Sequence, residues 1–192
     1  MDVFEAIKNR RSIRRYKPDP VDDKAIEAIL EAGRWAPSWA NTQCWRFMVV
    51  RDPETKAKVV ASLKGIRRQD KMSDNPATTA CNTVPVIIAV CAKTGRSGYG
   101  HGDEDGKAVT DKGDWFMFDT ALAVQNMVLA AHALGLGTVI IGAFDAPQVE
   151  KALGVPDGYR VVALFPVGVP DQEGKTPPRK ELSEITYKDK WG

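Results

Sequence analysis

Apolar positions in the first third of the chain recur at the spacing of amphipathic helices. A first short helix can be capped by Asp2, and the apolar positions of this helix are Val3, Phe4 and Ile7. Two prolines then interrupt the chain, and a second helix is predicted from Asp22 or Asp23 to about Gly33. The apolar stripe of this second helix consists of Ile26, Ile29 and Leu30.

Unbroken apolar runs farther along the chain predict strands that are buried on both faces. The clearest is the sequence PVIIAVC at residues 85–91, which is rich in β-branched side chains. Further strands are predicted at residues 47–50, 138–141 and 159–167. Shorter helices are predicted at residues 53–63 and 147–153. Residues 64–83 are polar and receive no assignment.

A helix at about residues 114–134 is apolar on nearly every side, which is typical of a core centre or a subunit interface. Before it, residues 93–114 contain six glycines and many charges, and a loop of this length predicts a mobile lid. Helices come first and then alternate with strands. We therefore predict a single domain over residues 1–192, of the α+β class, with a central mixed sheet.

Composition limits the possible classes of protein. The 192 residues carry a formal net charge of +2, with 43% apolar and 27% charged residues, which is ordinary for a soluble globular protein. The apolar segment at residues 115–135 approaches the length of a membrane span, but polar residues such as Asp119 favour a buried helix. The N-terminus has no apolar leader and the three cysteines lack CxxC spacing, so we expect a cytoplasmic protein with reduced thiols.

A cluster of cations gives the clearest indication of chemistry. Residues 8–17, KNRRSIRRYK, contain six lysines or arginines and no acidic residue. Guanidinium groups pair with two phosphate oxygens at once, and the hydroxyl of Ser12 can approach a phosphate oxygen closely. The low net charge makes the cluster a local feature and argues against a nucleic-acid surface. We interpret it as a phosphate clasp for a tightly bound cofactor; the alternative is a solvated basic helix end.

Other chemical motifs fail on spacing. Gly135, Gly137 and Gly142 do not form GxGxxG, and they follow a helix where that motif needs a strand. The sequence DEDG at residues 103–106 lacks the closing glutamate of a calcium loop. The two histidines stand without clustered cysteines, so no metal site is predicted, and no serine–histidine–acid triad can be assembled. We interpret His132 as a core histidine with satisfied hydrogen bonds.

Several segments, taken in order, resemble the nitroreductase family of FMN-dependent enzymes. These segments are RRSIR at residues 10–14, APSWANTQCW at 36–45, LGLG at 134–137, IGAF at 141–144, PVG at 166–168 and Arg179. No single segment is specific, whereas the ordered set covers nearly the whole chain. The resemblance implies a three-layer α+β sandwich with helices on both sides of the sheet. It also implies an obligate homodimer with two FMN sites in its interface, each built from both chains.

The resemblance assigns roles to individual residues. The matches to the family's phosphate and ribityl contacts are Arg10, Arg11, Ser12, Arg14 and, from the tail, Arg179. The loop after the second helix also matches the flavin site through Pro37, Ser38, Asn41 and Gln43, and the last three match positions that meet the partner subunit's flavin. Ile141 and Gly142 match the segment along the reactive face, where a backbone N–H could bond to flavin N5.

Purely structural interpretations remain open for the same residues. Asn41 and Gln43 could simply satisfy backbone groups in a polar loop, and Gly142 could serve a turn at a strand end. Cys44 stands where the family usually has proline, and Gly142 where some relatives carry glutamate. We interpret Cys44 as a packed, unreactive thiol. The aromatic residues at positions 115–118 are interpreted as packing, whereas Trp39 lies inside the loop that matches the flavin site.

The resemblance implies an FMN-dependent oxidoreductase. NADH or NADPH would give hydride to flavin N5, and a small nitroaromatic, quinone or enone acceptor would then take two electrons in a ping-pong cycle. No side chain is assigned as catalytic, because the flavin carries the chemistry. The alternatives are a non-catalytic flavin-binding or storage protein, a dehalogenase or flavin-fragmenting member of the same fold, and a nucleotide- or RNA-binding module. Neither a nucleic-acid partner nor a membrane association is expected.

Overall fold

The computed structural model of the chain describes residues 1–68, 71–100 and 107–191. Its centre is a four-stranded sheet in the order β1 (Trp45–Val50), β4 (Val86–Lys93), β6 (Tyr159–Gly168) and β5 (Gly137–Thr138). Neighbouring strands pair antiparallel. Among the described residues, parallel pairing is limited to an isolated bridge between Ser12 and Thr138, so the strand pairs of the sheet are antiparallel and not mixed. The predicted α+β class is confirmed.

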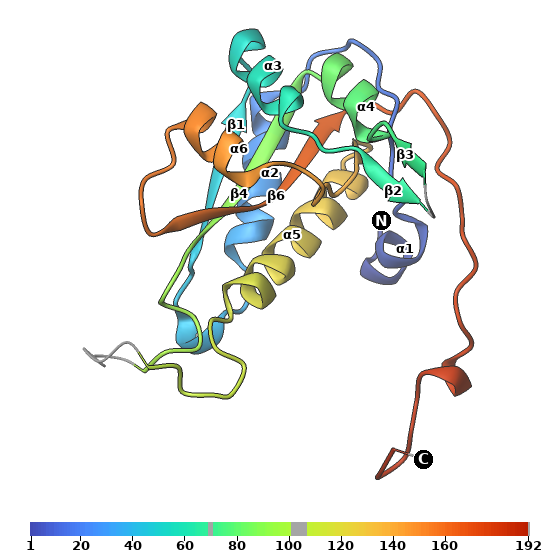
Figure 1. Cartoon of the computed structure of the whole chain (residues 1–192). Helices are drawn as coiled ribbons and strands as arrows, with labels where there is room; N and C mark the ends of the chain where they lie inside the picture. The colour runs from blue at the N-terminus through green and yellow to red at the C-terminus, as the bar shows by residue number, and fades with distance from the viewer. Residues whose placement is uncertain (69–70, 101–106, 192) are drawn as a thin grey trace.

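Helices cover both faces of this sheet and make three layers (Figure 1). Successive side chains of β4 point to opposite faces of the sheet, and all but the last are buried. Both faces of the sheet are therefore covered. Val86, Ile88 and Val90 pack with α2 (Asp23–Arg34) and α5 (Phe116–Ala133). Ile87 and Ala89 belong to the opposite core with α3 (Pro53–Ala61), α4 (Ala77–Thr83) and α6 (Ala146–Leu153).

Carboxylate caps set the points where several helices begin. The helix α1 (Val3–Asn9) begins after Asp2, whose side chain accepts from the Glu5 amide at 3.0 Å in a capping box. The side chains of Asp22, Asp52 and Asp145 likewise accept from a backbone amide in the first turn of α2, α3 and α6. The predicted helix starts near these aspartates are therefore confirmed, and each has a local hydrogen-bonding cause.

The remaining differences from the sequence prediction are local. The predicted strand at residues 138–141 is shorter, because the chain pairs only at Gly137–Thr138 and returns as an isolated bridge between Ile141 and Leu164. Residues 64–83, which received no assignment, contain the hairpin of β2 (Ile66–Arg68) and β3 (Lys71–Ser73) and the helix α4. Residues 101–106 of the predicted lid lie outside the described residues, so the lid stays a prediction.

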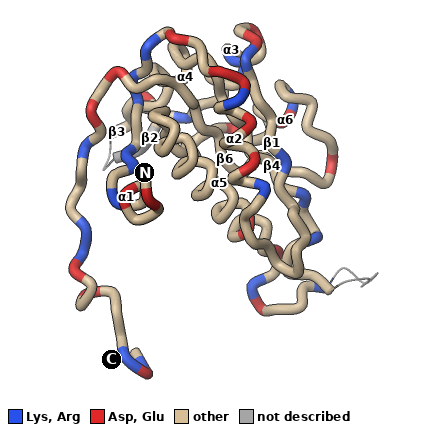
Figure 2. The backbone as a smooth tube through the Cα atoms, turned by 180° about the vertical axis from the view of Figure 1, so that it is seen from behind, with Lys and Arg blue, Asp and Glu red and all other residues tan. Residues whose placement is uncertain are grey.

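The C-terminal tail leaves the sheet after β6 and runs past α1 before extending away from the body (Figure 1). It is irregular apart from a 3-10 turn, η2 (Leu182–Glu184). Lysine and arginine residues recur along it (Figure 2). Apolar side chains are exposed on the tail and on α1, including Phe4 at 80% and Leu182 at 76% exposure.

Two predictions about the core are also tested. Cys44, Cys81 and Cys91 are free and buried, as expected for unreactive thiols. In the described part of the chain, no helix combines the length and apolar character needed to cross a membrane.

Candidate cofactor site

A hollow of about 750 Å³ lies between the N-terminal segment and the C-terminal tail. Its volume is within the range of small-molecule sites. The residues that line it are Arg10, Arg11, Ser12, Arg14, Pro76, Gln172, Lys175, Thr176, Pro177 and Arg179. Five of these are cationic and none is acidic. The structure therefore brings together the five residues that the sequence proposed for phosphate binding, and we call this space the phosphate hollow.

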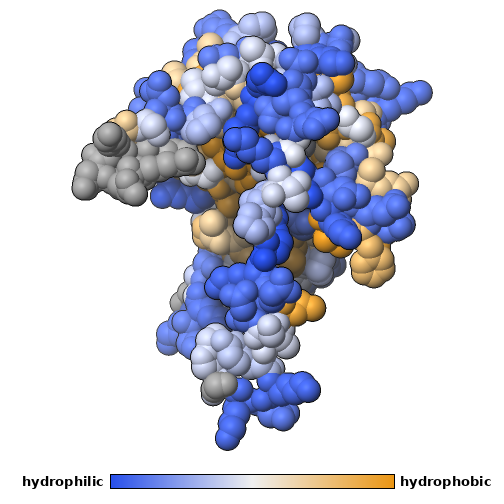
Figure 3. Space-filling view, turned by 90° about the vertical axis from the view of Figure 1, so that its right-hand side faces the viewer, coloured by the Kyte–Doolittle hydropathy of each residue, from blue (hydrophilic) through white to orange (hydrophobic). Residues whose placement is uncertain are grey.

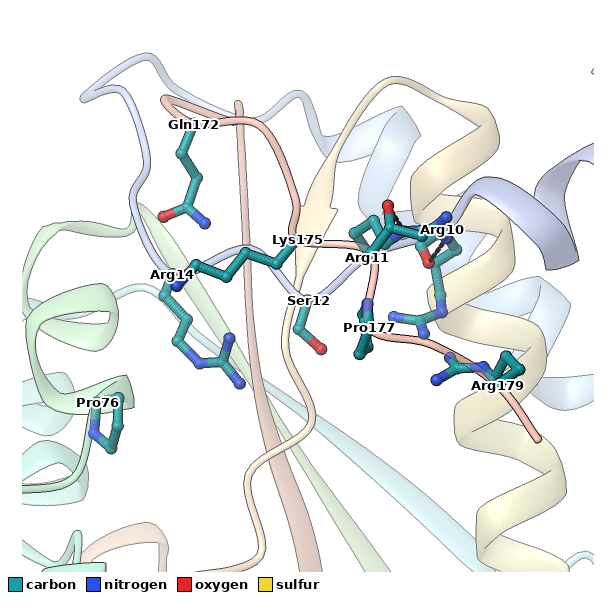
Figure 4. Close-up of a pocket in the computed structure, with 10 residues that line it drawn as sticks. Arg10, Arg11, Ser12, Arg14, Pro76, Gln172, Lys175, Pro177 and Arg179 are labelled. Atoms are coloured by element: carbon teal, nitrogen blue, oxygen red, sulfur yellow. Dashed lines mark hydrogen bonds between the residues drawn. The ribbon is translucent and has the colours of Figure 1, made fainter.

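The extended backbone after α1 explains how these side chains reach the hollow. The Ile13 amide donates to the Thr138 carbonyl at 2.9 Å, and the buried Tyr16 hydroxyl donates to the Ile13 carbonyl at 2.7 Å. Ile13 is buried in the core, so its neighbours on either side point the other way. Figure 4 shows the Ser12 hydroxyl and the guanidinium groups of Arg10, Arg14 and Arg179 directed toward the same space.

Arg11 has a different set of contacts from the other cations. Its guanidinium donates to the carbonyls of Lys8 and Arg10 at 2.6 and 2.9 Å, and to the Thr176 hydroxyl at 3.0 Å. It therefore ties the end of α1 to the tail. It also covers carbonyl groups at the negative end of that helix, which would otherwise repel a phosphate. The phosphate contact expected of Arg11 stays a prediction, whereas its structural contacts are formed within the chain.

Electrostatic repulsion marks the hollow as a place for an anion. Burial, then the charges of Arg11 and Arg179, lower the pKa of Arg10. Within the described part of the chain, no acidic side chain forms an ion pair with Arg10, Arg14 or Arg179. A bound phosphate would relieve this repulsion.

The same cations affect His132, near the C-terminal end of α5. Burial, then the charges of Arg10 and Arg11, lower the pKa of this imidazole. Its Nε2 atom is buried and has no hydrogen-bond partner among the described residues. The prediction of a histidine with satisfied hydrogen bonds is therefore wrong. Its neutral form suits a position beside two guanidinium groups better than an imidazolium would.

A second, smaller hollow of about 130 Å³ continues from the first and shares Arg14 and Pro76 with it. Residues 139–143 form its other wall. The Ile141 amide already donates to the Leu164 carbonyl at 2.8 Å, so it is not free for a cofactor. The Gly142 amide makes no backbone hydrogen bond in the described part of the chain, and a Cβ at Gly142 would meet no atom within 4 Å. The open position in this segment is therefore Gly142.

Asn75 holds the far wall of this second hollow in place. Its amide group donates to the carbonyls of Lys64 and Ala143 at 3.1 and 3.0 Å, and its side-chain oxygen accepts from the Ala77 amide at 3.0 Å. The segment before α4 is thereby fixed against residues 139–143. Sequence reasoning missed this wall because residues 64–83 show no hydrophobic period.

The loop that matches the flavin ring lies elsewhere in the same chain. Trp39–Asn41 form a 3-10 turn, η1, which contacts Asp119 near the beginning of α5. His132 and the phosphate hollow lie near the other end of that helix, about 20 Å away at 1.5 Å per residue. A single chain therefore does not bring together all the candidate residues: Pro37, Ser38, Asn41 and Gln43 are separate from the rest.

An aromatic cluster accompanies this loop. The rings of Trp39 and Trp115 lie 5.4 Å apart, and those of Trp115 and Phe118 lie 5.0 Å apart. The cluster is only partly packed, because Phe118 is 56% exposed. Nearby, Cys44 is buried, and burial and the Asp119 carboxylate raise the pKa of its thiol to about 11. The interpretation of Cys44 as an unreactive thiol agrees with this environment.

The tail contributes more to the phosphate hollow than the sequence indicated. Besides Arg179, it supplies Lys175 and Thr176. The signal was present in the sequence KTPPRK at residues 175–180, where cations flank a rigid proline pair. What the sequence could not show is that Arg11 bonds to Thr176 and so holds the tail across the hollow.

Known proteins resemble this chain over nearly its whole length. The family model described as "Nitroreductase family" matches residues 7–169. An NADH dehydrogenase of Thermus thermophilus is 30% identical over 207 aligned positions, which cover 96% of this chain and 95% of that protein. A 5,6-dimethylbenzimidazole synthase of Rhodobacter capsulatus is 27% identical, covering 91% and 86% of the two chains. A crystal structure of a Desulfovibrio desulfuricans protein in complex with FMN has 31% identity and a TM-score of 0.74, covering 100% and 99%.

Proposed function

Because this chain belongs to the nitroreductase family, we propose that it is an FMN-dependent oxidoreductase that uses NADH or NADPH to reduce a small organic acceptor. The observation that carries the proposal is the phosphate hollow, in which five cationic side chains face no acidic residue. The phosphate of FMN carries close to two negative charges, which suits this set of donors. Relatives named as NAD(P)H oxidoreductases and the FMN complex of a similar structure support the same choice.

The residues of the chain would hold the cofactor in two parts. Arg10, Arg14 and Arg179 would bind the phosphate, with Ser12 as a hydroxyl donor and Lys175 as a further cation at the rim. The Gly142 amide would face the flavin ring from the second hollow, where the absence of a side chain leaves room for close approach. When bound, FMN supplies the redox chemistry by accepting hydride from the nicotinamide and passing two electrons to the acceptor.

The proposal includes a homodimer in which a second chain completes each site. Pro37, Ser38, Asn41 and Gln43 are remote from the phosphate hollow within one chain, as expected if they serve the other subunit's flavin. Apolar side chains are exposed on α1, on the start of α5 and on the tail, and hydrophobic surface is visible on the face that carries the tail (Figure 3). An extended arm with exposed apolar residues is suited to packing against a second copy. Light scattering should therefore give twice the chain mass.

Other parts of the proposal concern location and acceptor. The three free thiols fit a reducing compartment, so we keep the cytoplasm as the expected location. The acceptor would be of the nitroaromatic, quinone or enone type. A partly exposed aromatic cluster at Trp39, Trp115 and Phe118 is compatible with such planar molecules.

A second candidate function is fragmentation of the flavin itself. The relative named 5,6-dimethylbenzimidazole synthase covers most of both chains and supports this candidate. The two functions differ in their products. Incubation of reduced FMN with the protein in air, followed by chromatography, would yield dimethylbenzimidazole only from a fragmenting enzyme. An oxidoreductase would return FMN intact.

The decisive experiment is a visible spectrum of the purified protein followed by anaerobic addition of NADH and then NADPH. We expect a yellow protein with FMN that one of the two nicotinamides bleaches within seconds. A yellow protein that only dithionite bleaches would instead be a flavin-binding or storage protein. Colourless protein that cannot be reconstituted with FMN would refute the proposal.

A further inference from the structure

Residues 38–43, which we call the flavin loop, hold a backbone conformation that their sequence disfavours. Ala40, Asn41 and Gln43 have φ angles of 45°, 54° and 45°, in the left-handed region that asparagine adopts readily but alanine and glutamine adopt rarely. All three are exposed, so core packing does not impose this shape. Such strain persists only where surrounding contacts over-determine it, and it concentrates at functional sites.

The main anchor is the buried carboxylate of Asp119 on α5, which is 1% exposed. Its two oxygens lie 3.2 and 3.1 Å from the Trp39 amide nitrogen, which donates to them from inside the flavin loop. Within the loop, the Gln43 amide donates to the Ser38 hydroxyl at 3.0 Å. The Gln43 side chain donates to the Asn41 side-chain oxygen at 3.2 Å. The internal bonds fix the loop's shape, and Asp119 fixes its position on the fold.

The same carboxylate also holds the segment that follows β4. The fully buried Ser97 hydroxyl donates to Asp119 Oδ2 at 2.5 Å, and the Ser97 carbonyl accepts from the Trp115 amide at 2.9 Å. The Cys44 thiol lies 3.9 Å from the same oxygen. Only neutral donors surround this carboxylate among its described hydrogen-bond partners. Burial of a carboxylate destabilises the fold unless both of its oxygens accept hydrogen bonds.

We propose that Asp119 is a positioning residue for the flavin ring. By fixing the flavin loop and the Ser97 segment to one rigid helix, it sets where Asn41 and Gln43 meet the ring edge and where the Trp39–Trp115 pair stands beside it. This inference rests on the proposed function, in which the flavin loop contacts the partner subunit's FMN. The inference adds to that function a residue that touches neither the phosphate nor the ring. The carboxylate of this residue links the flavin loop to the Ser97 segment.

Asparagine at this position gives a sharp test, because Asp119→Asn keeps the side-chain shape but replaces one acceptor oxygen with a donor. In either orientation that NH2 group would lie against the Trp39 amide, which contacts both oxygens of Asp119 and can only donate. Ser97→Ala removes one donor only and serves as a milder second variant. Asp52→Asn is the matched control, because Asp52 also accepts from a backbone amide, that of Thr55 at 2.7 Å, but caps α3 on another part of the fold.

The experiment compares the four proteins after loading with excess FMN. We expect Asp119→Asn to retain FMN, since the phosphate hollow is unchanged, but to alter the visible circular dichroism of the flavin. We expect its kcat/KM for nicotinamide oxidation to fall by about 10- to 100-fold, because a displacement of about 1 Å at a reacting site can cost about 100-fold in rate. Ser97→Ala should shift both readouts in the same direction by less, and Asp52→Asn should shift neither.

The flavin's dichroism distinguishes positioning from simple destabilisation. If Asp119→Asn melts at a lower temperature but keeps the wild-type flavin spectrum and kcat/KM, Asp119 is structural only and the inference is overturned. If Asp119→Asn does not fold, wild-type dichroism and kinetics in Ser97→Ala overturn it equally. Failure of the proposed function is a separate result, because the wild-type protein itself would then fail to bind or reduce FMN.

Discussion

The paired variant Arg10→Ala with Arg179→Ala tests the phosphate hollow most directly. These side chains come from opposite ends of the chain, and both point into the hollow. A hydrogen bond between charged groups contributes about 1.5–3 kcal/mol, so losing two should cost roughly 3–6 kcal/mol of FMN binding. This corresponds to roughly two to four powers of ten in the dissociation constant. Riboflavin lacks the phosphate, so its affinity should change little.

The same variant should not destabilise the protein without cofactor. The pKa of Arg10 is lowered by burial and by the charges of Arg11 and Arg179, which means that these cationic groups repel one another. Removing two of the charges should leave the melting temperature of the apoprotein unchanged or higher. A loss of FMN binding accompanied by higher stability would separate a ligand site from a structural one.

Fluorescence titrations with FMN and with riboflavin, at one fixed salt concentration, measure the effect. The control is Arg15→Ala with Lys180→Ala, which removes the same charge from residues that do not line the hollow. Full FMN occupancy in the Arg10–Arg179 variant would refute the phosphate assignment. An equal loss of riboflavin affinity would refute it as well, since the ring and not the phosphate would then be affected.

Three further predictions concern the tail, a histidine and the thiols. Gly174→Ala should weaken FMN binding without unfolding the protein, because the added Cβ would overlap with Cβ of Arg11 and displace the tail; an unchanged FMN titration would contradict this. The pKa of His132 is lowered, so the unfolded state takes up a proton first and the free energy of unfolding should fall as pH drops below about 6.5. Urea titrations at pH 7.5 and 5.5 should show a smaller fall in His132→Gln, and an equal fall would exclude this role. Burial raises the pKa of Cys44 to about 11, so a thiol reagent at pH 8 should label it only in urea, and rapid labelling of the folded protein would show an open site.

The sequence predicted the helices and strands whose hydrophobic spacing or capping residues gave a clear signal. The run at residues 85–91 became β4, and aspartates at residues 22, 52 and 145 begin three helices. It failed at residues 64–83, because a hairpin of two three-residue strands and a seven-residue helix are too short to show a period. Short elements of this kind take their shape from tertiary contacts such as those of Asn75.

The site shows the same division between local and long-range information. The cations at residues 10–14 are adjacent in sequence, so their cooperation could be inferred from it. The structural role of Arg11 could not, because it depends on which carbonyls and which part of the tail lie within reach of its guanidinium. Asp119 was visible only as a polar residue in an apolar helix, and its partners Trp39 and Ser97 are 80 and 22 residues away.

The phosphate hollow joins residues 10–14 to residues 172–179, so the first part of this site leaves the ribosome long before the second part is made. A nascent chain can build the sheet and its helices while the second half of this site does not yet exist. In the proposed function, FMN is then captured only once residues 172–179 have been made. The yield of loaded protein would therefore follow the concentration of free FMN at that moment, and protein made faster than flavin is supplied would accumulate empty with its tail unanchored by any ligand.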